Sequence, residues 1–299
     1  MRTIARSISA RPALASIAVL LVAMVSIQVG AALAKTLLPA VGAAGAAALR
    51  LAFASLLLLG SSRPWRSLPS RHALPAIIGY GFAMGGMNLL FYSALQRIPL
   101  GIAVALEFTG PFAVAVSATR RGVDFFWCAC AVAGLWLLLP LHARIGALDP
   151  VGIGYALAAG GCWALYILFG RRAGQLHRGG VAFFGMLAGS VLVVPIGIDT
   201  AGMSLWAPAL WPVAVGVAIL SSALPYSLEM YVLTRLPARS FGVLMSAEPA
   251  VAALSGFCFL GERLSPLQWF AILCIMVASG GSAATSAGTA TGGAAPVSG

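Results

Sequence analysis

LQRIP at residues 95–99 recurs as LTRLP at residues 233–237, and this pair of motifs decides the fold. Each motif is followed by a second proline at the same spacing, Pro111 after the first copy and Pro249 after the second. The offset between the copies is 138 residues for both features. Each motif joins one long apolar segment to the next, which indicates a duplicated membrane protein. Two halves that face each other across a cavity near the bilayer midplane are an architecture of secondary transporters.

Composition places this chain in lipid. Of its 299 residues, 61% are hydrophobic and only 8% are charged, whereas soluble domains carry about 25% charged residues. The mean hydropathy is +0.98. A net charge of +11 raises the question of nucleic acid binding, but most arginines lie in short gaps between apolar segments and form no basic face with interleaved aromatics. We therefore expect a lipid bilayer, and no nucleic acid, as the partner.

The sequence contains no pattern that predicts a cofactor, a metal site or an enzyme. All five cysteines lie inside apolar segments without a CxxC pair, and the three histidines are scattered. Ser-His-Asp, HExxH and glycine-rich phosphate-loop patterns are absent from plausible contexts. The cysteines are better explained as small packing residues.

Apolar runs of roughly the length that a bilayer requires predict an all-α membrane protein with ten transmembrane helices, arranged as two inverted five-helix repeats. The N-terminus imitates a signal peptide, but its apolar run is long for one and further spans follow it, so we expect it to be the first helix. We expect a cytoplasmic N-terminal segment at 1–13, a first repeat at 14–141, a second repeat at 151–284 and a disordered tail at 285–299. The ten spans are predicted at 14–34, 40–60, 73–95, 100–118, 124–141, 151–170, 180–198, 209–233, 239–259 and 265–284.

Positive charges in the gaps predict the orientation of the spans. With a cytoplasmic N-terminus, the inner side holds 13 of the 18 basic residues, the outer side holds four, and Arg50 lies within a span. The four outer residues are Lys35, Arg97, Arg144 and Arg263. This bias predicts a multi-pass protein of the inner membrane with both termini in the cytoplasm. Five spans per half then invert the second half relative to the first, which is the arrangement that supports alternating access.

Four charged residues remain inside the predicted spans: Arg50, Glu107, Glu229 and Glu248. A charge at the centre of a membrane helix costs about 2.5–3.5 kcal/mol on insertion scales, so each is a candidate for substrate binding or proton coupling. Under the 138-residue offset Glu107 aligns with Met245, and Glu248 lies three residues further, on the same helix face. We therefore expect the two carboxylates on equivalent faces of equivalent helices.

Prolines beside three of these charges predict helix breaks. Pro111 cannot donate a hydrogen bond to the carbonyl of Glu107, Pro249 cannot donate to that of Met245, and Pro225 cannot donate to that of Ser221. Broken helices at membrane depth are tolerated where they line a cavity or where neighbours repair them.

Each charged candidate also has a structural interpretation. Glu107 and Glu248 either line a central site or bond to a neighbouring helix beside a kink. Arg50 needs an anion, either an internal glutamate or a substrate carboxylate. Glu229 lies about one turn from the cytoplasmic end of its span, where it either handles substrate and protons or pairs with nearby arginines.

Uncharged polar and aromatic residues complete the candidate set, although aromatics in membrane helices more often serve packing than ligand contact. The GxxxG pattern at 81–85 is typical of close helix contact. The candidates are Gln28, Asn88, Tyr92, Trp163, Tyr166 and Tyr226.

Several longer stretches resemble the drug/metabolite transporter superfamily, in particular its EamA-type members with ten spans in two five-span repeats. The likeness runs from about residue 14 to 284. Within the superfamily these stretches are similar to the bacterial exporters of threonine and homoserine. They are VAMVSIQ at 22–28, PLGIAVALEFTGP at 99–111, AILSSALPYSLEM at 218–230, MSAEP at 245–249 and LGE at 260–262.

The resemblance implies export of small amino acids across the inner membrane, coupled to protons. For a zwitterionic substrate, Arg50 would hold the carboxylate, Glu107 or Glu248 would accept the ammonium group, and the other glutamate would carry the proton. Two alternatives remain: an exporter of another metabolite, such as a cationic drug, an aromatic amino acid or a nucleobase, and a membrane enzyme or scaffold.

Overall fold

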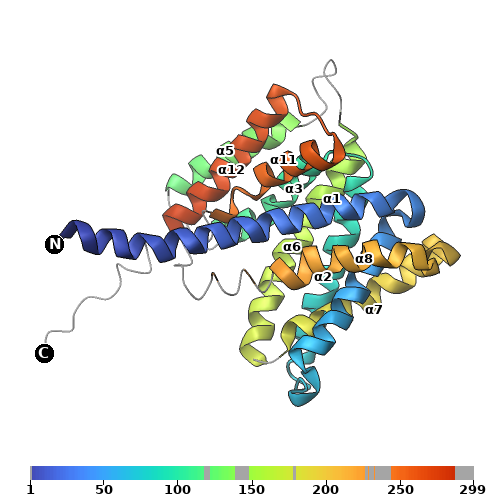
Figure 1. The fold of residues 1–299 in the computed structure, drawn as a ribbon. Helices are drawn as coiled ribbons and strands as arrows, with labels where there is room; N and C mark the ends of the chain where they lie inside the picture. Colours follow the sequence, from blue (N-terminus) through green and yellow to red (C-terminus); the bar gives the residue numbers. More distant parts are fainter. Residues whose placement is uncertain are drawn as a thin grey trace, which may run out of the picture.

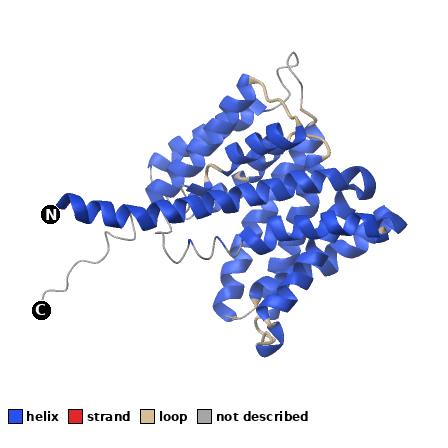
Figure 2. Ribbon diagram, in the orientation of Figure 1, coloured by secondary structure: helices blue, strands red, loops and turns tan. Residues whose placement is uncertain are grey.

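The computed structural model describes residues 2–117, 122–138, 148–177, 180–225 and 244–286, together with 228 and 232. Every regular element in these ranges is a helix (Figures 1 and 2). The first half contains α1 (Arg2–Ser62), η1 (Pro64–Arg66), α2 (Leu74–Leu95), α3 (Leu100–Glu107), α4 (Thr109–Ser117) and α5 (Gly122–Leu138). The second half contains α6 (Pro150–Leu176), α7 (Val181–Ala201), η2 (Gly202–Trp206), η3 (Pro208–Leu210), α8 (Trp211–Ala218), η4 (Ile219–Ala223), α11 (Glu248–Leu260) and α12 (Pro266–Ser286).

The predicted all-helical membrane fold is confirmed. Among the described residues, four helices are long and apolar enough to cross a bilayer, and shorter apolar helices accompany them. The four are Ala15–Gly60, Leu74–Leu95, Pro150–Leu176 and Val181–Trp206. The count of ten remains a prediction, because the expected spans at 209–233 and 239–259 run partly through residues outside the described ranges.

Helix α1 holds the first two expected spans in one stretch of 61 residues. The chain remains helical through the expected gap after residue 34 and turns at Gly42, whose φ of 67° and ψ of −179° are non-helical. A positive φ suits glycine because it has no Cβ. At its other end α1 begins at Arg2, so residues 2–13 continue the first helix in the structure.

Helix α12 runs to Ser286, slightly beyond the expected end of the last span. The rest of the expected tail, residues 287–299, lies outside the described residues.

The two halves interlock rather than pack as separate bodies. Helix α1 lies against α7, α8 and η4, α2 lies against α6 and α7, and α5 lies beside α12 (Figure 1). At the α3–α11 contact, a Cβ atom placed on Gly101 would come within 2.5 Å of the Cα of Ala253, so only glycine permits this approach. One cluster of buried apolar residues spans both halves.

Large apolar side chains on the outer surface suit a lipid environment. Phe125 of α5 is 79% exposed, and Phe257 and Phe259 of α11 are about 60% exposed. In water such a surface would promote association, whereas lipid solvates it.

Candidate functional site

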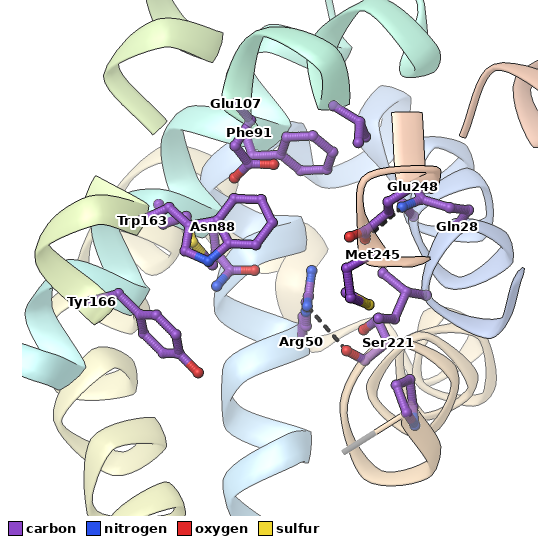
Figure 3. A pocket seen from close by; sticks show the side chains of 15 residues that line it. Gln28, Arg50, Asn88, Phe91, Glu107, Trp163, Tyr166, Ser221, Met245 and Glu248 are labelled. Carbon is purple, nitrogen blue, oxygen red and sulfur yellow. Dashed lines mark hydrogen bonds between the residues drawn. The ribbon is translucent and has the colours of Figure 1, made fainter. Parts of the chain in front are cut away.

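A cavity of about 220 Å³ lies between the two halves (Figure 3). Pockets for drug-sized ligands measure about 300–1,000 Å³, so this cavity suits a smaller molecule. Its walls come from both arms of α1, meaning the parts of this helix before and after the turn at Gly42. They also come from α2, α3, α6, η4 and the segment that leads into α11. The lining residues are Ile27, Gln28, Ala31, Arg50, Met87, Asn88, Phe91, Val104, Glu107, Trp163, Tyr166, Ser221, Pro225, Met245 and Glu248.

Two glutamates, one from each half, reach this cavity. Glu107 is the last residue of α3 and is 7% exposed, and Glu248 is the first residue of α11 and is 5% exposed. Figure 3 places their side chains in the same cavity, as the 138-residue offset predicts. Glu248 also lies in the first helical turn, where the helix dipole favours negative charge.

Helix interruptions accompany both glutamates. In the first half the helix is interrupted at Phe108, between α3 and α4, three residues before Pro111. In the second half a turn at residues 246–247 precedes Glu248 and Pro249. The carbonyl oxygen of Glu107 faces α6 so closely that a Cβ on Gly160 would lie 2.7 Å from it. A neighbouring helix therefore covers the carbonyl that Pro111 deprives of a donor.

Acceptor atoms gather on one side of the cavity around Gln28. Its Nε2 donates to Glu248 Oε1 at 3.0 Å, and both residues are buried. Among the described residues, the Gln28 carbonyl oxygen Oε1 is buried without a hydrogen-bond partner. An unsatisfied buried acceptor costs about 1–3 kcal/mol, and a ligand donor that reached it would remove that cost.

The guanidinium of Arg50 lies on another wall of the same cavity, held by both halves of the chain. Its Nη1 donates to the Tyr92 hydroxyl at 3.2 Å. Its Nη2 donates to the backbone carbonyl of Ser221 at 3.2 Å (Figure 3). The carbonyl of Ser221 is the one from which Pro225 withholds an α-helical donor. Glu107 lies within electrostatic range of both Arg50 and Glu248. One cavity thus combines a cation with two carboxylates.

Aromatic rings close the remaining wall. Trp163 of α6 meets Phe108 edge to face, with ring centroids 5.3 Å apart. Tyr166 stacks on Tyr80 at 4.7 Å and their hydroxyls are hydrogen-bonded at 3.2 Å. Asn88 is buried and donates to the carbonyl of Met84 in its own helix at 2.9 Å. These contacts fix the shape of the cavity around its charged groups.

The structure brings most of the predicted site residues together. Tyr92 does not line the cavity but holds Arg50, and Pro111 and Pro249 lie beside the two glutamates. Tyr226 and Glu229 lie outside the described residues. The predicted residues that line the cavity are Gln28, Arg50, Asn88, Glu107, Trp163, Tyr166, Pro225 and Glu248.

Sequence reasoning missed the apolar part of the lining. Met87, Phe91 and Met245 look like any other apolar residue of a membrane helix, so no signal marks them. The Pro225 offset identified the carbonyl of Ser221 as an acceptor without an α-helical donor, but it did not predict that Arg50 would be the donor. No group of three or more potential metal ligands occurs among the described residues.

Comparisons with known proteins identify the family of this chain. Residues 150–282 match the EamA-like transporter family. The chain is 52% identical over 279 residues to the threonine/homoserine exporter RhtA of Escherichia coli K12, covering 93% of this chain and 95% of that protein. It is 53% identical over 269 residues to RhtA of Salmonella typhimurium LT2, covering 90% and 91%. An uncharacterized transporter of Bacillus subtilis, YwfM, is 28% identical and covers 69% of this chain and 72% of its own length.

A solved crystal structure shares the fold. It superposes with a TM-score of 0.60 at 20% sequence identity and covers 91% of this chain and 96% of the other.

Proposed function

This chain belongs to the EamA-like transporter family, and we propose that it exports threonine and homoserine from the cell. Identity of 52% along nearly the whole chain to a threonine/homoserine exporter supports the substrate class. In this proposal the chain is a transporter without enzymatic activity, in the bacterial inner membrane with both termini in the cytoplasm.

The observation that carries the proposal is the bipolar character of the small cavity. A zwitterionic amino acid presents one carboxylate and one ammonium group. The cavity offers the Arg50 guanidinium for the first, and Glu248 with the orphaned carbonyl oxygen of Gln28 for the second. A guanidinium binds a carboxylate through two parallel hydrogen bonds, which fixes orientation as well as charge. The hydroxyl of either substrate then extends toward the polar and aromatic wall.

Glu107 carries the coupling proton in this proposal. It is buried and belongs to the half opposite Glu248, and it lies within electrostatic range of Arg50 and Glu248. A glutamate that becomes neutral no longer incurs the cost of a charge at membrane depth. Protonation and release at Glu107 would therefore change the free energy of moving the site between the two sides, while the inverted halves rock around it.

The test is efflux of labelled homoserine and threonine from loaded cells or vesicles, with and without a proton uncoupler. We expect efflux above that of an empty-vector control, and we expect the uncoupler to reduce it. Efflux that ignores the uncoupler would remove proton coupling but leave the substrates. Efflux of neither compound would remove the amino-acid assignment and turn attention to cationic and aromatic substrates.

A further inference from the structure

In the second half of the chain, the helix that lines the cavity contains a π-helical turn. Helix α8 ends at Ala218 and continues as the π-helical η4, Ile219–Ala223. Pro225 follows two residues later and has no N–H group, so it cannot donate to the carbonyl of Ser221. π-Helical turns are rare, and they are frequent at functional sites.

Both arms of α1 lie against this turn. From the first arm, Ser26 Oγ donates to the carbonyl of Leu220 at 2.7 Å. Gly30 lies so close that an added Cβ would be 3.0 Å from the backbone nitrogen of Ser221. From the second arm, Arg50 Nη2 donates to the carbonyl of Ser221 at 3.2 Å. Two successive carbonyls of the turn thus accept hydrogen bonds from side chains of the first half.

From these contacts we propose that Pro225 is a positioning residue for Arg50. By withholding an N–H group, it keeps the carbonyl of Ser221 available as the anchor that aims the guanidinium into the substrate cavity. This inference rests on the proposed function, because the aim of the guanidinium matters only if Arg50 binds the substrate carboxylate.

A second hydrogen-bond acceptor, the Tyr92 hydroxyl, helps to fix the direction in which the Arg50 guanidinium points. The Tyr92 hydroxyl accepts from Arg50 Nη1 at 3.2 Å, and the guanidinium carbon lies 5.8 Å from the centre of the Tyr92 ring. Tyr92 is fully buried, so its hydroxyl is a fixed reference point. A guanidinium carries five N–H donors in one plane, so bonds to two anchors orient that plane and the same group can bind a carboxylate.

The two anchors come from different halves of the chain. Tyr92 belongs to α2 in the first half and Ser221 belongs to η4 in the second. The orientation of the Arg50 guanidinium therefore depends on the relative position of the two halves. A movement between the halves would change how the guanidinium binds a carboxylate.

The test compares Pro225→Ala with wild type in equilibrium binding to the purified full-length protein. The probes are labelled homoserine and, as a competitor, 3-aminopropan-1-ol, which has the same amine and hydroxyl without the carboxylate. Alanine restores the N–H group, and the carbonyl of Ser221 is drawn into the helix. We expect the Kd of homoserine to rise roughly tenfold, as for the loss of one hydrogen bond to a charged group. The Kd of the amine should not change.

Pro195→Ala is the matched control, because Pro195 lies within α7, is exposed and does not line the cavity. Neither Kd should change in this variant. Pro225→Gly also restores the N–H group but favours the helix less than alanine, so it should show a smaller effect of the same kind.

Two results would overturn the inference. Equal weakening of both ligands by Pro225→Ala would assign the proline to helix packing, and an unchanged Kd for homoserine would leave it without a role in the site. A wild-type protein that binds homoserine no better than the amine would instead contradict the carboxylate clamp of the proposed function, so the two failures are distinguishable.

Discussion

At the scale of single residues, the two cavity glutamates differ in what holds them, and this difference predicts different phenotypes. Glu248 accepts a hydrogen bond from Gln28 on the side of the cavity where acceptor atoms gather, so Glu248→Gln should raise the KM for homoserine through loss of the ammonium partner.

Glu107→Gln should instead make efflux slow and insensitive to the uncoupler, because the amide cannot release a proton. Both are measured as efflux from loaded vesicles at several substrate concentrations.

Asp199→Asn is the control for these variants, since it neutralises a carboxylate on the exposed surface of α7, away from the cavity. It should transport at the wild-type rate. If Glu107→Gln and Glu248→Gln also do so while reaching the membrane at normal levels, the central carboxylates have no role in transport.

Arg50 gives a second prediction at this scale. Arg50→Lys retains a positive charge but loses the planar fork, so it cannot hold Tyr92, the carbonyl of Ser221 and a carboxylate in one geometry. We expect the KM for homoserine to rise by roughly ten- to a hundredfold, as for loss of one or two charge-assisted hydrogen bonds. Competition by 3-aminopropan-1-ol should be unaffected. Equal loss for both ligands would make Arg50 a structural residue.

The sequence identified the charged part of this site because lipid makes a charge inside an apolar span costly and therefore conspicuous. Arg50, Glu107 and Glu248 stand out for that reason alone. Met87, Phe91 and Met245 could not be found in this way, because an apolar residue in an apolar helix carries the same pattern whether it faces lipid, protein or ligand. Their position depends on packing between helices far apart in the chain.

At the scale of helices, Glu262 joins three elements on the side predicted to face outward. Its Oε1 pairs with Lys35 Nζ of α1 at 2.5 Å, and its Oε2 accepts from the backbone N–H of Leu100, the first residue of α3, at 2.8 Å. Gly261, with a φ of 66°, ends α11 and turns the chain so that Glu262 can reach across. A Cβ on Gly256 would lie 2.4 Å from the Glu262 carboxylate, so a side chain there would displace the carboxylate from this position.

This arrangement predicts a graded loss of stability. Glu262→Gln loses the ion pair with Lys35 but retains an oxygen for the N–H of Leu100, whereas Glu262→Ala loses both. Loss of a helix N-terminal cap costs about 1 kcal/mol, so the alanine variant should unfold at the lowest temperature and the glutamine variant between it and wild type. Thermal unfolding of the purified proteins measures the order. Identical melting temperatures for all three would show that this contact does not stabilise the fold.

The start of α6 gives a prediction about pH. Arg97 Nη1 pairs with Asp149 Oδ2 at 2.6 Å, and Asp149 Oδ1 accepts from the N–H of Val151 as the cap of α6. The hydrogen bond from Arg97, followed by that from Val151, lowers the pKa of the Asp149 carboxyl below its ordinary value. The stabilisation is therefore present above the unfolded pKa of about 3.9 and is lost as the pH falls through the lower folded value.

Asp149→Asn isolates the charge, because asparagine caps a helix about as well as aspartate. We expect its melting temperature to lie slightly below that of wild type at pH 6, and the difference to shrink as the pH falls below the unfolded pKa of about 3.9 and through the lower folded pKa, beneath which aspartate is protonated in both states. A difference that does not change with pH would attribute the effect to the cap rather than to the ion pair.

The helices themselves were largely predictable, and their ends were less so. Apolar length predicts where a helix lies in lipid, and the prolines at 111 and 249 predict where the helices at the site are interrupted. The turn in α1 was not predicted. The gap after residue 34 contains Lys35 and Pro39, yet the chain remains helical there and turns at Gly42, because a positive φ is available to glycine and tertiary contacts decide where it is used.

At the scale of the whole molecule, the duplicated motif predicts a relation between the halves that no local pattern contains. The offset of 138 residues places Glu107 and Glu248 in corresponding predicted spans, 100–118 and 239–259. In the structure α3, which ends at Glu107, contacts α11, which begins at Glu248, beside the cavity. The close approach of Gly101 and Ala253, together with the bond from Glu262 to α3, closes the halves against each other on the predicted outer side. Alternating access would require this contact to open.

A reversible cross-link tests that requirement. Lys35→Cys and Glu262→Cys, introduced after the five native cysteines are replaced, put thiols on the two partners of the ion pair. A bifunctional methanethiosulfonate should join them and stop homoserine efflux from vesicles, while homoserine still binds to the purified protein because the cavity is intact. A reducing agent should restore efflux, and either single-cysteine variant should be unaffected by the reagent. A cross-linked protein that exports at the uncross-linked rate would contradict the movement, because substrate would then leave the cavity without separation of α1 and α11 at this contact.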